Sequence, residues 1–118
     1  MAIPITVPAD TSALTFTVDT DSNNYRYWKW AAFTWRTSDG SSMHQIAWAD
    51  WTSSRRSFQI DVAALSGRTL AIQLTHQDDV PPAAWQPTVS IAADSGADLG
   101  THPCILKTGI EARFTFTF

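Results

Sequence analysis

The chain of 118 residues has little cysteine, little charge and no long apolar run. Cys104 is its single cysteine, which excludes an internal disulfide. No apolar stretch approaches the roughly 20 residues that a membrane helix needs. The first ten residues, MAIPITVPAD, lack a basic segment and carry two prolines, unlike a signal or transit peptide. We therefore expect a soluble chain made in the cytoplasm, and release by a non-classical route stays open.

Charged residues make up only 16% of the chain, and the net charge is -3. Arg55 and Arg56 are the only adjacent cations, so the sequence lacks the basic surface that nucleic acid requires. It also lacks the lysine clusters that attract anionic lipid. Glu111 is the only glutamate, and no G-x-S-x-G motif occurs. We expect no catalysis, no nucleic-acid binding and no membrane binding.

Metal-ligand patterns are present only in fragments. Asp19, Asp21 and Asn23 have the spacing of the first three calcium-loop ligands, but Asn24 stands where that loop needs glycine and Trp30 where it needs glutamate. A further set of potential ligands lies in two later loops: His76, Asp78, Asp79, His102 and Cys104. Their spacing matches no zinc signature. We predict no metal and no cofactor, and leave calcium at residues 19 to 23 as an open alternative.

Apolar residues alternate with polar ones along most of the chain, which is the period of half-buried strands. The alternating sets are Leu14, Phe16 and Val18; Phe58, Ile60 and Val62; Leu70, Ile72 and Leu74; Val89 and Ile91; and Ile110, Ala112, Phe114, Phe116 and Phe118. Turn-forming residues separate these sets. The pattern predicts one domain over residues 1–118, an all-β antiparallel sandwich, jelly-roll-like, with seven or eight strands.

Residues 58–74, FQIDVAALSGRTLAIQL, read as a strand, a glycine turn and a second strand. The segment resembles one that is common in jelly-roll carbohydrate-binding modules of the galactose-binding-domain-like type. The matching positions are Asp61, Val62, Leu65, Gly67, Arg68 and Leu70. The resemblance implies the sandwich fold. It carries over no binding residue, because this segment is scaffold in those modules.

Aromatic residues are concentrated at 25–35, YRYWKWAAFTW. Asp39-Gly40 predicts a two-residue type I′ hairpin turn, in which paired positions sum to 79. Ala31 then lies opposite Trp48, and Phe33 opposite Ile46. We expect one hairpin face to enter the core, with Phe33, Trp35, Ile46 and Trp48. The other face is expected to present Trp28, Trp30 and Trp51 to solvent, separated by alanines in a shallow trough.

Three interpretations of this aromatic face stay open. Indole faces stack on sugar rings while neighbouring polar side chains bind the hydroxyls. Exposed aromatics also form protein interfaces, and a loop that carries Trp85 could instead bury the face. Our hypothesis is a non-catalytic, lectin-like carbohydrate-binding protein. The alternative is a structural or assembly protein whose exposed aromatics form a homo-oligomer or partner interface.

The expected ligand-binding residues belong to the hairpin and to the loop at 76–87, HQDDVPPAAWQP. They are Trp28, Trp30, Trp51, Arg26, Arg36, Gln45, Asp78, Asp79 and Trp85. Pro81 and Pro82 are expected to stiffen the loop and hold Trp85 at the rim. The expected partner is a carbohydrate or glycoconjugate. Weak single sites gain from multivalency, so we also expect a homo-oligomer.

Overall fold

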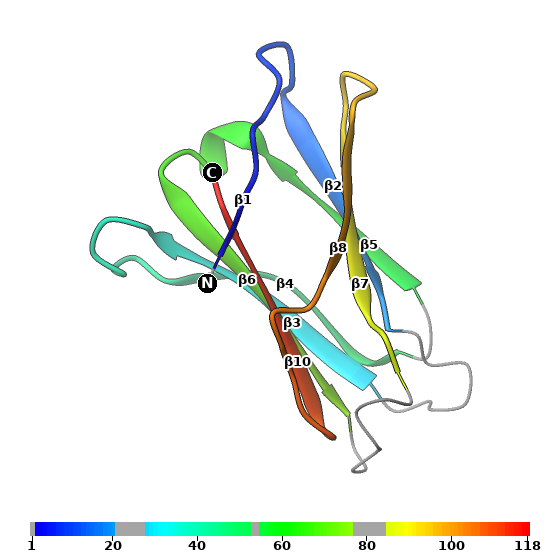
Figure 1. The fold of residues 1–118 in the computed structure, drawn as a ribbon. Helices are drawn as coiled ribbons and strands as arrows, with labels where there is room; N and C mark the ends of the chain where they lie inside the picture. The colour runs from blue at the N-terminus through cyan, green and yellow to red at the C-terminus, as the bar shows by residue number, and fades with distance from the viewer. Residues whose placement is uncertain (1, 21–27, 53–54, 77–84) are drawn as a thin grey trace.

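The computed structural model describes residues 2–20, 28–52, 55–76 and 85–118 of the chain, which form two sheets packed face to face (Figure 1). The first sheet has the order β1-β10-β6-β3-β4, and β9 also pairs with β10. Its strands are β1 (Ile3–Pro4), β3 (Trp28–Arg36), β4 (His44–Thr52), β6 (Arg68–His76), β9 (Leu106–Lys107) and β10 (Glu111–Thr117). The second sheet has the order β5-β2-β7-β8. Its strands are β2 (Ala13–Asp19), β5 (Arg55–Asp61), β7 (Thr88–Ala93) and β8 (Asp98–Pro103).

The connectivity consists of two nested motifs. In the first motif β2 pairs with β5 in one sheet, while the hairpin β3–β4 between them pairs in the other sheet. In the second motif β6 pairs with β10, while the hairpin β7–β8 between them pairs in the opposite sheet. The motifs join through β3–β6 in one sheet and β2–β7 in the other. Each sheet is therefore built from both halves of the chain.

The core between the sheets is formed by the alternating apolar residues. The buried members include Leu14, Phe16, Val18, Leu70, Ile72, Leu74, Val89, Ile91, Ala112, Phe114 and Phe116. Phe16 contacts Phe116 of the other sheet, with ring centroids 6.1 Å apart. Burial of these side chains is the main favourable contribution to folding. The all-β antiparallel sandwich predicted from the sequence is confirmed.

The segment from 58 to 74 crosses from one sheet to the other. β5 leads into a 3-10 turn, Val62–Ala64, and β6 begins at Arg68 in the opposite sheet. Gly67 has a φ of 69°, a left-handed conformation that favours glycine. The strand, glycine turn and strand read from the sequence are present. Among the described residues, no helix is long and apolar enough to cross a membrane.

The loop between β3 and β4 is longer than the two-residue turn that Asp39-Gly40 predicts. β3 ends at Arg36 and β4 begins at His44. Gly40 has a positive φ of 71°, but Asp39 does not, so a type I′ turn does not form there. Hydrogen bonds from Gly40 N to Arg36 O and from Arg36 N to Ser41 O close the loop at 2.7 and 2.8 Å. The predicted turn type is wrong, although the hairpin exists.

Candidate functional site

In the described part of the aromatic hairpin, the side chains of β3 and Trp48 of β4 face the opposite way from the sequence-based expectation, whereas Ile46 packs against the core as expected. Trp30, Ala32 and Thr34 of β3 are buried, whereas Trp48 of β4 is 62% exposed. Phe33, expected in the core, is half-buried and lines an open groove on the outer side of the sheet. Trp30, expected in solvent, is only 5% exposed.

The pairing of β3 with β6 explains this reversal. Residues directly opposite each other in an antiparallel pair lie on the same face of the sheet. Trp30, Ala32 and Thr34 lie opposite Leu74, Ile72 and Leu70, which are fully buried. The aliphatic residues of β6 therefore determine which residues of β3 enter the core.

Trp30 joins the two sheets at one end of the core. Its indole stacks on Phe58 of β5 in the opposite sheet, with ring centroids 5.5 Å apart and an interplanar angle of 28°. Phe58 in turn stacks on Phe16 at 5.2 Å. Aromatic pairs of this geometry are stabilised beyond the area they bury. Trp30 is a core residue.

The predicted hairpin register is correct in the middle of the strands and shifts on either side. Ala31 pairs with Trp48 and Ala32 with Ala47, as expected, but Phe33 pairs with Gln45. A bulge at Ile46 accounts for this shift, because one additional residue of β4 lies between those pairs. Trp48 and Gln45 consequently lie on the outer face with Ala31 and Phe33.

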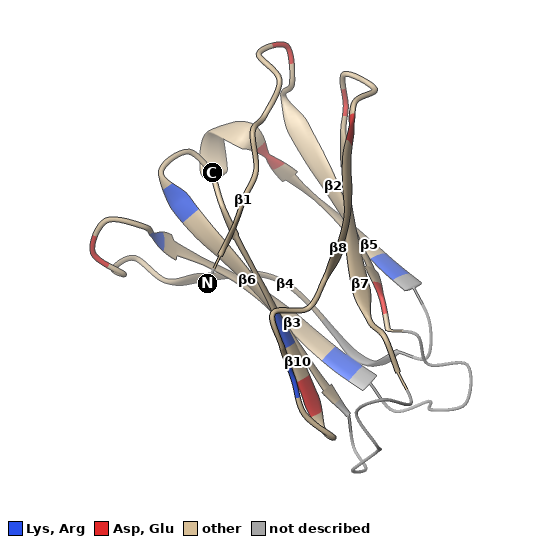
Figure 2. Cartoon of the chain, viewed as in Figure 1, with Lys and Arg blue, Asp and Glu red and all other residues tan. Residues whose placement is uncertain are grey.

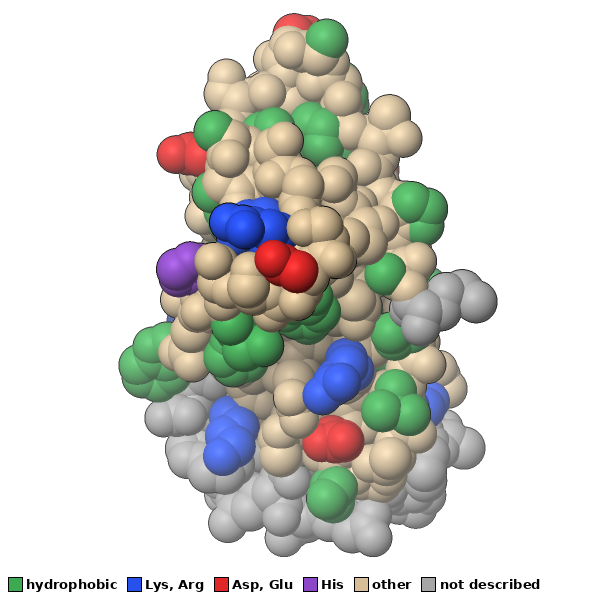
Figure 3. Space-filling view, turned by 90° about the vertical axis from the view of Figure 1, so that its left-hand side faces the viewer, with side chains coloured by type: hydrophobic (Ala, Val, Ile, Leu, Met, Phe, Trp, Pro, Cys, Tyr) green, Lys and Arg blue, Asp and Glu red, His purple; other side chains and the backbone are tan. Residues whose placement is uncertain are grey.

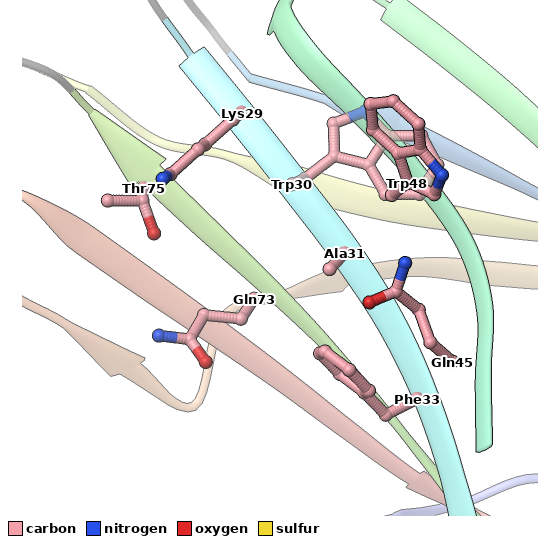
Figure 4. A pocket seen from close by; sticks show the side chains of 8 residues that line it. All are labelled: Lys29, Trp30, Ala31, Phe33, Gln45, Trp48, Gln73 and Thr75. Carbon is pink, nitrogen blue, oxygen red and sulfur yellow. The ribbon is translucent and has the colours of Figure 1, made fainter.

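The outer face of β4, β3 and β6 contains a groove of about 300 Å³. Figure 4 shows its lining: Lys29, Trp30, Ala31, Phe33, Gln45, Trp48, Gln73 and Thr75. Trp48 forms one wall of the groove. Ala31 lies between Trp48 and Gln73, and its small side chain forms the floor. This groove is a different surface from the trough expected between Trp28, Trp30 and Trp51, and of those three residues only Trp30 contributes to its lining.

A polar ledge borders this groove on β6 and β10 and consists of Gln73, Glu111 and Arg113. Gln73 Nε2 donates a hydrogen bond to Glu111 Oε2 at 3.0 Å, and Arg113 Nη2 donates to Gln73 Oε1 at 3.5 Å. Figure 2 shows the acidic and the basic residue close together on β10. The ledge therefore offers a carboxylate acceptor and a guanidinium donor side by side.

Seen from the side of this sheet, apolar side chains alternate with basic and acidic ones (Figure 3). The outer face of the second sheet is different. There Ser57, Thr17, Ser90 and Thr101 lie in one row across four strands. The hydroxyl pairs Thr17–Ser57 and Ser90–Thr101 are each 2.9 Å apart. Among the described strand residues, aromatic side chains on an outer face belong to the first sheet alone.

The predicted binding residues are dispersed. Gln45 lines the groove, and Trp30 contributes to it from the core. Arg36 lies at the end of β3, where its Nη1 is 3.8 Å from Asp39 Oδ2 in an exposed ion pair. Arg26, Asp78 and Asp79 fall outside the described residues, as do the side chains of Trp28 and Trp51.

The expectation of a rim position for Trp85 is wrong, because its side chain is fully buried in the core. Lys107 Nζ donates a hydrogen bond to Trp85 O at 2.9 Å and lies 5.9 Å from the centre of the ring. Trp85 thus fills the sandwich next to β7.

Sequence reasoning missed six residues that line the groove: Lys29, Ala31, Phe33, Trp48, Gln73 and Thr75. A signal for Gln73 and Thr75 existed. They alternate with Leu70, Ile72 and Leu74, so they had to point outward. Which face of β3 and β4 points outward depends on the β3–β6 pairing. This pairing joins residues about 40 positions apart in the chain.

Of the remaining chemical candidates, His102 and Cys104 can be followed in the described residues. No group of three His, Cys, Asp or Glu side chains in the described part of the chain could hold a metal ion. Asp21 and Asn23 of the calcium-like spacing lie outside that part. His102 bonds through Nε2 to Leu99 O at 2.9 Å, and its ring contacts Phe116. Burial raises the pKa of the Cys104 thiol, which lowers its reactivity.

No family model matches the chain, and no curated protein matches it. The crystal structure of S. officinalis PLC21 aligns with 94% of this chain and 16% of that chain, at 7% identity and a TM-score of 0.23. An endo-beta-1,4-glucuronan lyase from the fungus Trichoderma reesei aligns with 90% of this chain and 56% of that chain, at 9% identity and a TM-score of 0.18. The chain thus spans only part of either protein, and similarity this low carries no argument about function.

Proposed function

We propose that this protein is a non-catalytic, lectin-like carbohydrate-binding protein whose site is the groove on the outer face of β3, β4 and β6. The observation that carries the proposal is the exposed indole of Trp48 beside a shallow, partly polar groove. An indole face provides a flat apolar surface for the C–H groups of a sugar ring. The proposal moves the stacking residue from Trp30 to Trp48.

The polar residues of the groove support the same function. Gln45 and Gln73 each present an amide that both donates and accepts hydrogen bonds, as a sugar hydroxyl does. A few polar groups within apolar walls are typical of small-ligand sites.

A specific observation also favours the alternative, an assembly protein with an aromatic interface. β4, which carries Trp48, is the last strand of its sheet, and exposed edge strands can pair with another chain. In that case a second copy or a partner would cover Trp48. A substitution of Trp48 would abolish glycan binding under the first function and self-association or partner binding under the second.

The test is a glycan array probed with the wild-type protein and with Trp48→Ala and Gln73→Ala variants. We expect both variants to lose the wild-type signal, because each removes one wall of the groove. Ile105→Ala is the control, since Ile105 is an exposed apolar residue that does not line the groove. Circular dichroism spectra establish that all variants fold.

Light scattering of the same proteins distinguishes the alternative. Under the carbohydrate proposal, Trp48→Ala keeps the mass of the wild type. If Trp48→Ala instead halves the particle mass, and the wild type binds no glycan on the array, the assembly interpretation replaces the proposal.

A further inference from the structure

A second hollow continues the groove along the same face. It has a volume of about 260 Å³ and is lined by Phe33, Trp35, Met43, Ala71, Gln73 and Arg113. Phe33 and Gln73 belong to both hollows. Met43, at its edge, is 63% exposed. The face therefore has two adjacent hollows that share an aromatic ring and an amide.

Each hollow has its own indole. Trp48 lies opposite Ala31, and Trp35 follows four residues later along β3. At the rise of a β-strand, these positions are about 14 Å apart along the strand direction. This separation is greater than the width of one sugar ring. A ligand that contacts both indoles must therefore be a chain of linked rings.

The charges around the two hollows indicate the kind of chain. Lys29 lines the first hollow and Arg113 the second, and the Glu111 carboxylate lies beside them, hydrogen-bonded to Gln73. Groups of both signs therefore border the hollows, and a strongly charged ligand of either sign would be repelled by at least one of them. A neutral polyhydroxylated chain can donate to the carboxylate and accept from the guanidinium at once.

We infer that the outer face of β3, β4, β6 and β10 is an extended site with two subsites, and that its occupant is a neutral linear oligosaccharide. One subsite is at Trp48 and the other at Trp35, with Phe33 and Gln73 between them. This inference rests on the proposed function and specifies its ligand class. A single terminal sugar occupies only one of the two subsites.

The test measures affinity against chain length by titration calorimetry. The probes are glucose and the cello-oligosaccharides to cellohexaose, mannose and the β-1,4-manno-oligosaccharides to mannohexaose, and maltose to maltohexaose. In at least one series we expect the affinity to rise steeply between one and four units. Trp35→Ala should then weaken tetrasaccharide binding roughly ten-fold or more, while binding of the shortest ligand changes less than two-fold.

Two further variants make the result specific. Phe33→Ala should weaken short and long ligands alike, because Phe33 lines both hollows. Thr17→Ala, on the outer face of the other sheet, should change neither. A glucuronic acid oligomer of matched length should bind more weakly than the neutral chain.

The outcomes separate the inference from the proposed function. Equal affinity for one unit and four units, with no effect of Trp35→Ala, overturns the two subsites but leaves a lectin with one site. Tighter binding of the acidic oligomer overturns the neutral ligand. Binding of no glycan of any length or charge overturns both the inference and the proposed function.

Discussion

At the scale of single residues, the two tryptophans at positions 30 and 48 have opposite roles although they are close along the same hairpin. Trp30 is buried and stacks on Phe58 across the core. Trp48 is on the outer face of an edge strand. A buried tryptophan stabilises the fold, whereas an exposed one is available for binding.

Substitution of these two residues by alanine should have very different effects on stability. Trp30→Ala should lower the free energy of unfolding by about 3–5 kcal/mol, because it leaves a cavity in the core. Trp48→Ala should change it by no more than about 0.5 kcal/mol, as at other surface positions. Urea denaturation followed by circular dichroism measures both. Trp30→Phe keeps part of the packing and should fall between them, and equal effects of the two alanine variants would contradict the reversed orientation.

Cys104 should be a slow thiol. Burial raises its pKa, so less of the reactive thiolate is present at pH 8 than in free cysteine. We expect Ellman's reagent to react with the folded protein roughly ten-fold more slowly than with glutathione. In 8 M urea the rate should approach that of glutathione. A folded protein that reacts as fast as glutathione would show that this thiol is more exposed and ionised than described.

Asp39 offers a test of the loop between β3 and β4. Hydrogen bonds from the Ser41 hydroxyl at 2.7 Å and from the Ser41 backbone N–H at 3.0 Å hold the pKa of Asp39 below its usual value. A carboxyl group with a lowered pKa stabilises the fold above its unfolded-state pKa, near 3.9, and loses this effect as the pH falls through its folded-state pKa. Ser41→Ala should raise the pKa of Asp39 in an NMR titration. Ser38→Ala, in the same loop, should leave it unchanged.

At the scale of elements, the connection from β5 to β6 depends on the backbone of one residue. Gly67 has a φ of 69°, and apart from its two neighbours in the chain no residue has an atom within 4 Å of the place where a Cβ would stand. Gly67→Ala should therefore cost about 1 kcal/mol through backbone conformation alone, without a steric clash. Thermal denaturation measures the loss, with the neighbouring exposed Ser66→Ala as control. A loss near zero would mean that the turn adapts to the alanine.

Most of the strands could be predicted from the sequence because their alternation is local. Leu14, Phe16 and Val18 alternate with threonines, and all three are in the core. The aromatic hairpin was different, since both of its faces are apolar and alternation could not distinguish them. Its orientation is determined by pairing with β6, a contact between segments that are distant in the chain.

Only the kind of surface at the candidate site, and not most of its residues, could be predicted from the sequence. The sequence indicated an aromatic trough with small residues on this hairpin, and Gln45 within it. The sequence predicts a core position for Trp48, the indole that borders the groove. The reason is that Phe33 and Ile46, which the predicted register places on the same face, are apolar residues typical of a core. The bulge at Ile46 has no local signal in the sequence, and it is what lets both Ile46 and Ala47 pack against the core.

At the scale of the whole molecule, the candidate site lies across the junction of the two nested motifs. Trp48 and Phe33 belong to the first motif, and Gln73 and Arg113 belong to the second. The β3–β6 pairing holds these halves together. The groove therefore exists only where both halves of the chain have assembled.

The oligomeric state remains a prediction at this scale. A shallow site with few polar groups binds one glycan weakly, and several copies on one assembly raise the apparent affinity. We expect sedimentation equilibrium to give a mass of at least two chains, unchanged in Trp48→Ala. A monomer at the concentrations that bind multivalent glycan would contradict this expectation.

Under the proposed function, the placement of the groove across the two motifs makes glycan binding a measure of whether both halves of the molecule are correctly folded. A molecule that is misfolded in either half lacks the residues of one side of the groove. It should therefore not bind glycan, even if its other half keeps native strands. Retention on a glycan column would then sort intact molecules from damaged ones, which a spectroscopic measure of strand content could not do.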